Sequence, residues 1–412
     1  MANTSLGVAV IGGGMAGRAH AAGYRMATTL FGTDRPDVRL VAIADANAAV
    51  ADDTAKRYGY ERAEYDWRAI AAADDIDVVS VVVANHLHRE MVEGLLAAGK
   101  HVLCEKPLAA SRADAEAMVE AAAAADTVTA VGYTYRRSPA VEQIRRELAA
   151  GTIGDLVHFN GHYWCDYALD PGSPITWRYR GGPGTGALAD VGSHLVDLAE
   201  FICGPIAEIS GARFHTVITE RPVPIGTTYG HTRAAVSDEM APVENEDVAT
   251  FTATFAGGAA ATFSASRVAH GLADGLGFEM FGTSGSAAWE LARIAEFQIA
   301  TELAPVDVPT AGSAPEEHRP GVVSRRAVNG PRRVTIGPEH PYIRGGLPMD
   351  AGGVGHGKAE LFAYQARAFL DQVAGIDELG PLPGFDVGVH SMRVVEAITE
   401  SARGGGATVK VV

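Results

Sequence analysis

The fold of the first third of the chain is decided by the stretch Val8-Ala9-Val10-Ile11-Gly12-Gly13-Gly14-Met15-Ala16-Gly17. A short apolar run that suits a buried strand leads directly into the pattern G-x-G-x-x-G, and a helical pattern follows. In this setting Gly12 permits a tight turn, Gly14 lets a pyrophosphate approach the backbone, and Gly17 lets the helix pack closely on the strand. We therefore expect a dinucleotide to bind at Gly12, Gly13, Gly14, Met15 and Ala16, with its phosphates on the helix N-terminus.

The second expected strand ends at Asp45, whose carboxylate can accept hydrogen bonds from the hydroxyls of the adenosine ribose. The same charge repels a 2′-phosphate, and no Arg or Lys follows directly, so the sequence favours NAD over NADP. The gap from Gly17 to Asp45 is 28 residues (45 − 17), longer than the usual spacing of about 20. An insertion at Thr28–Asp37 accounts for the difference, and a simple turn residue is the alternative reading of Asp45.

Short apolar runs alternate with helical patterns throughout the first third of the chain. Strands are expected at Leu6–Ile11, Arg39–Ala44, Val78–Val83, His101–Cys104 and Val128–Val131, and helices at Met15–Leu30, Ala46–Tyr58, Arg89–Ala98 and Arg112–Ala125. This alternation indicates an α/β fold, a doubly wound parallel sheet of the Rossmann type.

The sequence pattern changes after residue 134, where several strand-like stretches follow one another directly. They are Ile153–Trp164, Ile206–Ile218, Asp247–Phe255, Ala259–Ser266, Phe278–Gly282, Ser286–Leu291 and Thr408–Val411, with helices at Pro139–Ala150, Asp190–Ile202, Ala359–Val373 and Asp386–Ala402. This pattern predicts an α+β domain with a large, mostly antiparallel open sheet. We divide the chain into an NAD-binding domain, 1–134, and a domain for substrate binding and oligomerisation, 135–412, whose terminal helices can pack back on the first. Residues 303–357 are rich in Pro and Gly and are expected to form a long loop.

Composition excludes several classes of partner. Lys and Arg number 34 and Asp and Glu 50, which gives a formal charge of −16 and argues against nucleic acid and against anionic membranes. Three cysteines form neither a disulfide framework nor a zinc motif, so we expect no metal and a reducing, cytoplasmic setting. Neither a signal peptide nor an apolar run of membrane-spanning length is apparent.

Polar residues cluster where the expected parallel strands end, which is the edge at which open α/β sheets bind ligands. Asn85 and His88 follow the third strand, and Glu105-Lys106-Pro107 follows the fourth. Much later, Asp190 and His194 stand four residues apart, so on a helix they share one face.

In this order, the motifs resemble those of the glucose–fructose oxidoreductase / inositol dehydrogenase / rhizopine-catabolism family of dehydrogenases, over nearly the whole chain. The likeness includes Gly132-Tyr133-Thr134-Tyr135-Arg136-Arg137-Ser138-Pro139 and Trp177-Arg178. It implies NAD-dependent oxidation of a secondary ring hydroxyl, for example C3 of a pyranose or of an anhydrosugar such as levoglucosan.

The resemblance implies three catalytic roles that the chemistry of the side chains supports. His194 is the expected base for the hydroxyl proton, since an ordinary imidazole titrates near 6.5. Asp190 is expected to orient the imidazole or to bind the same hydroxyl, and its charge to favour the imidazolium. Lys106 is expected to donate to the substrate oxygen. Each has a structural alternative: Asp190 as a helix cap, His194 as a core histidine and Lys106 as a surface residue.

Further residues are expected at the site because of the segments in which they lie. The cofactor would meet Asn85, His88, Glu105, Lys106, Trp177 and Arg178, and the substrate would meet Tyr133, Tyr135 and Asp166 besides the three catalytic residues. Aromatic faces with polar tips suit a polyhydroxylated ring. Tyr163 and Trp164 are neighbours on a strand and therefore face opposite sides.

Three other functions are open at this point: an inositol 2-dehydrogenase, an NAD-dependent glycosidase that oxidises C3 transiently, and a sensor that binds NAD and sugar without turnover. The second domain shows no helical cover for one face of its sheet. If that face is apolar, it marks an interface, so we expect a homodimer or homotetramer.

Overall fold

The computed structural model describes residues 5–31, 35–182, 184–226, 235–301, 330–346, 349, 351 and 356–411. Most of the expected loop 303–357 lies outside these residues. Within the described ranges, no helix has the length and apolar character needed to cross a bilayer.

The N-terminal part of the chain forms a six-stranded parallel sheet in the order β3-β2-β1-β4-β5-β6. Its strands are β1 (Leu6–Ile11), β2 (Val38–Ala44), β3 (Arg62–Glu64), β4 (Val78–Val81), β5 (His101–Cys104) and β6 (Thr129–Val131). The predicted Rossmann sheet is thus confirmed. The prediction missed β3 and the short helix α3 (Trp67–Ala72), because three half-buried residues leave little apolar pattern.

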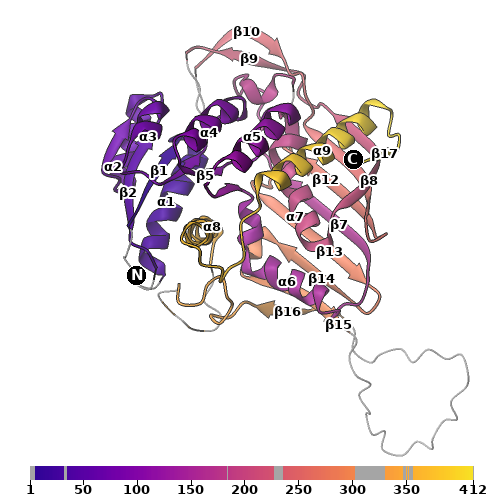
Figure 1. Cartoon of the computed structure of the whole chain (residues 1–412). Helices are drawn as coiled ribbons and strands as arrows, with labels where there is room; N and C mark the ends of the chain where they lie inside the picture. Colours follow the sequence, from indigo (N-terminus) through magenta and orange to yellow (C-terminus); the bar gives the residue numbers. More distant parts are fainter. Residues whose placement is uncertain are drawn as a thin grey trace, which may run out of the picture.

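Helices cover both faces of this sheet (Figure 1). They are α1 (Met15–Leu30), α2 (Ala48–Tyr58), α3, α4 (His88–Ala97) and α5 (Arg112–Ala124). Val8 and Val10 belong to the same buried cluster as Tyr24 of α1, whereas Ala9 belongs to a second cluster with Leu95 of α4. Burial of both faces explains why each strand is a continuous apolar run.

The second sheet has nine strands in the order β16-β15-β14-β13-β7-β12-β11-β8-β17. They are β7 (Leu156–Trp164), β8 (Ile206–His215), β11 (Val248–Phe255), β12 (Ala260–Ser266), β13 (Gly275–Gly282), β14 (Gly285–Glu290), β15 (Glu296–Thr301), β16 (Arg332–Thr335) and β17 (Val409–Lys410). Every pairing is antiparallel except that of β7 with β12, which confirms the expected sheet. A separate hairpin, β9 (Glu220–Pro224) with β10 (Val236–Pro242), was not predicted, nor were β15 and β16.

Among the elements that the structure describes, helices lie on one face of the nine-stranded sheet: α6 (Pro139–Ala149), α7 (Ser193–Cys203) and α9 (Phe385–Arg403) (Figure 1). The opposite face exposes Thr250, Thr252, Thr254 and Thr262. The expectation of an uncovered face therefore agrees with the structure. Alternation of apolar and threonine side chains along β11 makes this part of the face polar, whereas Phe281 of β13 is 43% exposed.

The C-terminal helices join the two sheets. Helix α8 (Lys358–Val373) packs against α1, where Gly23 lies so close that an added Cβ would stand 2.7 Å from the Phe362 carbonyl oxygen. The Val131 amide of β6 donates to the Pro383 carbonyl at 2.8 Å. One buried cluster accordingly runs from Val8 to Phe159 of β7. Division of the chain after residue 134 stays a prediction.

Candidate active site

The glycine turn between β1 and α1 is shaped for a dinucleotide phosphate. Gly12 has φ 105°, and an added Cβ would lie 2.0 Å from the Val82 carbonyl oxygen. A Cβ on Gly17 would lie 1.7 Å from the Gly12 carbonyl oxygen, so helix and turn are in direct contact. Within the described ranges, nothing lies within 4 Å of the corresponding position on Gly14, and no side chain caps α1. The open amides at this helix N-terminus fit a pyrophosphate.

Asp45, at the end of β2, is fixed by two main-chain amides. Gly13 N donates to one carboxylate oxygen at 2.8 Å, and Asn47 N donates to the other at 2.8 Å. The carboxylate is half-buried beside the glycine turn, as a group that accepts from ribose hydroxyls must be.

Glu105, at the end of β5, is held by a residue that the sequence analysis missed. His20 Nε2 lies 2.8 Å from Glu105 Oε1, and His20 Nδ1 lies 3.2 Å from the Ser80 hydroxyl. Gly132 makes room for this carboxylate, since an added Cβ would stand 2.5 Å from the same oxygen. His20 follows the glycine turn on α1, but nothing in its spacing distinguishes it from a core histidine.

Lys106 and Asp190, which are 84 residues apart in the sequence, are in contact. The Lys106–Pro107 peptide is cis. The Lys106 ammonium donates to the Asp190 carbonyl at 2.6 Å and lies 3.8 Å from Asp190 Oδ1. The Tyr167 hydroxyl donates to Asp190 Oδ2 at 2.5 Å. Both expected roles of Asp190, orienting the imidazole and binding the substrate hydroxyl, stay predictions.

The backbone that carries Asp190 and His194 is not the continuous α-helix that the sequence predicts. Leu188–Gly192 form a π-helical turn, and α7 begins at Ser193. Glu246 anchors this turn by accepting from the Leu188 amide at 2.8 Å. Single π turns inside helices are frequent at functional sites, where they alter the direction of a side chain.

His194 has three tyrosine rings as neighbours. Its ring centroid is 5.0 Å from that of Tyr135, 6.1 Å from that of Tyr163 and 6.4 Å from that of Tyr133. Burial, together with the ammonium groups of Lys106 and Lys358, lowers the pKa of His194 well below its ordinary value of 6.5. Burial and the two ammonium groups therefore favour the neutral imidazole at physiological pH, and the expected effect of the Asp190 charge stays a prediction.

Lys358 and Asp274 form a second polar group beside His194, and no motif indicated either residue. The Lys358 ammonium donates to Asp274 Oδ2 at 2.5 Å, and the Tyr163 hydroxyl donates to Asp274 Oδ1 at 2.8 Å. The Tyr163 and Tyr135 hydroxyls are 2.8 Å apart. These residues come from distant parts of the chain, so no local spacing could have revealed them.

A buried ion pair holds the main chain of the Trp177–Arg178 segment. Arg267 donates to Asp247 at 2.8 Å, with side chains 1% and 0% exposed, and also to the Arg178 carbonyl at 3.2 Å. The Arg178 guanidinium stacks 4.5 Å from the Trp177 ring, which is 39% exposed. Their contact with the cofactor stays a prediction.

Asn85 and His88 have structural partners. Asn85 Nδ2 donates to the Gly184 carbonyl at 3.1 Å. His88 is 1% exposed, and its ring nitrogens lie 3.1 Å and 3.2 Å from the carbonyl oxygens of Leu108 and Val83. Burial also lowers its pKa, which favours a neutral histidine; its expected contact with the cofactor stays a prediction.

Two expected substrate residues differ in their surroundings. Tyr133 is 2% exposed, and its hydroxyl is hydrogen-bonded to Ser391; its expected contact with substrate stays a prediction. Asp166 is half-buried on the loop after β7. Trp164 stacks on His162 at 3.9 Å on the face opposite Tyr163, which confirms that these neighbours diverge.

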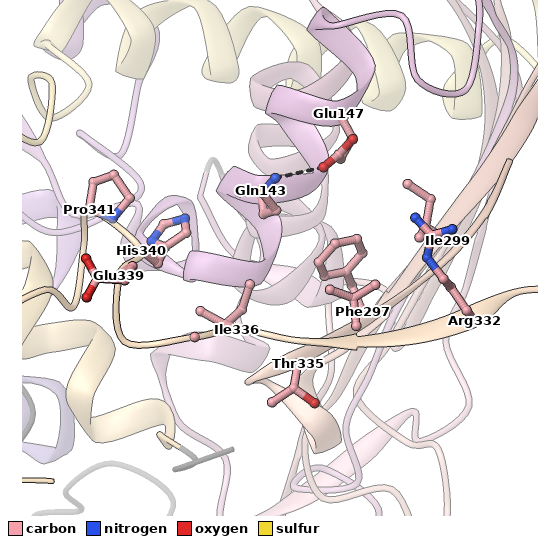
Figure 2. Close-up of a pocket in the computed structure, with 12 residues that line it drawn as sticks. Gln143, Glu147, Phe297, Ile299, Arg332, Thr335, Ile336, Glu339, His340 and Pro341 are labelled. Carbon is pink, nitrogen blue, oxygen red and sulfur yellow. Dashed lines mark hydrogen bonds between the residues drawn. The ribbon is translucent and has the colours of Figure 1, made fainter. Parts of the chain in front are cut away.

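A cavity of about 370 Å³ lies elsewhere, between α6 and the strands β15 and β16. Figure 2 shows Gln143 donating to Glu147 on its α6 side, with Phe297 and Arg332 on the strand side. None of Lys106, Asp190 and His194 lines it. In the part of the chain that the structure describes, no group of three or more His, Cys, Asp or Glu is arranged to hold a metal.

Comparison with known proteins gives a consistent result. Residues 6–133 match a family model described as an oxidoreductase family with an NAD-binding Rossmann fold, and residues 141–288 match the GFO/IDH/MocA C-terminal domain. Levoglucosan dehydrogenase of Pseudarthrobacter phenanthrenivorans is 35% identical over 97% of this chain and 96% of its own.

A solved structure of levoglucosan dehydrogenase in complex with NADH and levoglucosan covers 99% of this chain and 100% of its own, with TM-score 0.84 and 32% identity. D-glucoside 3-dehydrogenase of Escherichia coli is 29% identical over 54% of this chain and 61% of its own. The chain therefore belongs to the GFO/IDH/MocA oxidoreductase family and is an NAD-dependent oxidoreductase.

Proposed function

We propose that the chain oxidises a secondary ring hydroxyl, at C3 of a pyranose or of an anhydrosugar such as levoglucosan. The observation that carries the proposal is a neutral imidazole, His194, beside the ammonium of Lys106 at the carboxyl end of the Rossmann sheet. The substrates named in the two dehydrogenase relatives, levoglucosan and D-glucosides, support the sugar class and, for the second, the C3 position.

The side chains divide the chemistry between them. His194 takes the proton of the hydroxyl, because its low pKa keeps the imidazole unprotonated. Lys106 donates to the same oxygen and stabilises its growing negative charge. Asp190, fixed by Tyr167, binds the hydroxyl and holds the ammonium in place. Bound NAD supplies the acceptor for the hydride that leaves the carbon.

The residues proposed to hold NAD lie around the glycine turn. Gly12, Gly13, Gly14, Met15 and Ala16 would meet the pyrophosphate and Asp45 the adenosine ribose. Glu105, Lys106, Trp177 and Arg178 would lie toward the nicotinamide, with Asn85 holding the Gly184 loop beside it. Tyr135 and Asp166 are the proposed substrate contacts besides the catalytic residues.

The test is NADH formation with a panel of levoglucosan, glucosides and myo-inositol. We expect the sugars to be oxidised, and His194→Gln to lower kcat/KM by about 10²- to 10⁴-fold, the usual contribution of a general base, while NAD binding is kept. Unchanged activity in His194→Gln would remove the proposed mechanism. Oxidation of myo-inositol alone would indicate the inositol 2-dehydrogenase, release of aglycone without net NADH the glycosidase, and binding without turnover the sensor.

Two further proposals concern the setting of the enzyme. The uncovered face of the nine-stranded sheet supports a homodimer or homotetramer. The three cysteines are free thiols, two of them buried, which supports a reducing compartment such as the cytoplasm.

A further inference from the structure

Two groups of the same composition flank His194. In the first, the Lys106 ammonium lies 3.8 Å from Asp190, and Tyr167 donates to that carboxylate at 2.5 Å. In the second, Lys358 donates to Asp274 at 2.5 Å, and Tyr163 donates to the same carboxylate at 2.8 Å. The proposed reaction uses only the first group, so the second lacks a function.

The second group reaches the imidazole through Tyr135. The Tyr135 hydroxyl is 2.8 Å from that of Tyr163, and the Lys358 ammonium is 5.3 Å from the Tyr135 ring centroid. The same ring stands 5.0 Å from the ring of His194. Lys358 and His194 thus both neighbour the Tyr135 ring, and the Lys358 charge acts on the imidazole.

Exposure differs between the two ends of this group. Tyr135 and Tyr163 are 4% and 5% exposed, whereas the Lys358 and Asp274 side chains are 45% and 35% exposed. Satisfying the two buried hydroxyls accounts for Asp274. It does not account for Lys358, since an ion pair this exposed contributes only about 0–1 kcal/mol to folding. An ammonium has three donors, and Asp274 and Tyr135 occupy two of them, which leaves a donor for a ligand.

We propose that Lys358, aimed by Asp274, is a second anchor for the sugar, donating a hydrogen bond to a ring oxygen other than the one that His194 deprotonates. This inference rests on the proposed function. Two separate donors, Lys106 and Lys358, near one base select a ring that carries oxygens at two separated positions. Each ammonium is matched by one carboxylate, and Asp166, the other charged residue proposed to contact the substrate, adds a negative charge. The site therefore favours neutral sugars over sugar phosphates and uronic acids.

The experiment compares Lys358→Met with Lys358→Arg, and with Lys56→Met as a control on the exposed end of α2. Steady-state constants are measured for the sugar that the wild-type enzyme oxidises best and for its monodeoxy analogues. Binding of the sugar to the enzyme–NADH complex is followed separately by the fluorescence of NADH.

We expect Lys358→Met to raise KM and the sugar Kd by about 10- to 100-fold, the usual effect of losing one hydrogen bond to a charged group, with a much smaller change in kcat. One monodeoxy analogue should be a poor substrate of the wild type and should not be penalised further by Lys358→Met. Lys358→Arg should restore part of the affinity, and Lys56→Met should behave as the wild type.

A KM and sugar Kd within twofold of the wild-type values in Lys358→Met would overturn the anchor. If His194→Gln is inactive in the same assays, the proposed function survives that failure; if His194→Gln is fully active, the proposed function fails instead. Should Lys358→Met not fold, the wild-type deoxy panel decides: equal kcat/KM for every analogue that keeps the oxidised hydroxyl would also overturn the anchor.

Discussion

The reactivity of His194 depends on groups that face it from four parts of the chain. Its charged neighbours are Lys106 at the end of β5 and Lys358 at the start of α8, and its aromatic neighbours are Tyr133, Tyr135 and Tyr163. Burial and both ammonium groups act in the same direction and lower the pKa of the imidazole below 6.5. A base works only when it is unprotonated, so the fraction of active enzyme rises with pH through this lowered pKa.

We therefore expect the acid limb of kcat/KM to lie well below pH 6.5. Between neutral pH and pH 6.5, protonation of His194 should not lower the activity. Removing one positive charge in Lys358→Met should raise the pKa of His194 and move the limb to higher pH. The measurement is kcat/KM against pH for both proteins with saturating NAD. A wild-type limb at or above pH 6.5, or a limb that moves to lower pH in Lys358→Met, would contradict this account.

At the scale of single residues, the sequence predicted the part of the site that carries motifs. Lys106, Asp190 and His194 each lie in a recognisable segment. In the structure Lys106 contacts Asp190, and the charge of Lys106 lowers the pKa of His194. Lys358 and Asp274 were not predicted, because their contact spans 84 residues and neither position has a local pattern. The deep burial of Tyr133 and His88 was not predicted, since burial depends on tertiary packing, which spacing does not encode.

At the scale of elements, prediction succeeded where the signals are local. The bounds of β1 and α1 agree with those expected, because an apolar run, a glycine turn and a helical pattern follow one another directly. The π-helical turn Leu188–Gly192 was missed, since it depends on anchoring by Glu246 from another segment. Strand β16 follows a long segment without pattern and forms an edge of its sheet, so little in its sequence distinguishes it from a loop.

The contact between β1 and α1 makes a direct prediction for two glycines of the same turn. In Gly17→Ala the new Cβ would stand 1.7 Å from the Gly12 carbonyl, so α1 must move, and we expect a loss of about 1–3 kcal/mol in unfolding free energy and a lower Tm. Gly14→Ala meets no atom within 4 Å, so its stability should stay near that of the wild type while NAD binds more weakly. Thermal unfolding and NAD titration of both variants provide the test. Equal stability of the two would show that the close approach is not rigid.

At the scale of the whole molecule, the helices lie where the site needs support. Helix α8 packs on α1 of the Rossmann domain, and its first residue, Lys358, stands beside the imidazole. Helix α9 lies between α5 and β8 and so joins the two sheets on the same side (Figure 1). The opposite face of the large sheet has no such cover among the described elements, and this asymmetry leaves it available to a second copy of the chain.

That face carries threonines such as Thr262 of β12, next to Asn160 of β7, together with the rings of Trp164 and Phe281. Such a mixed face can pack on a second copy, and a stable interface buries about 1,200–2,000 Å². We expect sedimentation or light scattering to give two or four times the chain mass of 43.0 kDa. Thr262→Arg should lower that mass, because a long charged side chain would be buried without a partner. Asp53→Arg, on the exposed side of α2, should leave it unchanged. A wild-type mass of one chain at micromolar concentration would show that this face is simply solvated.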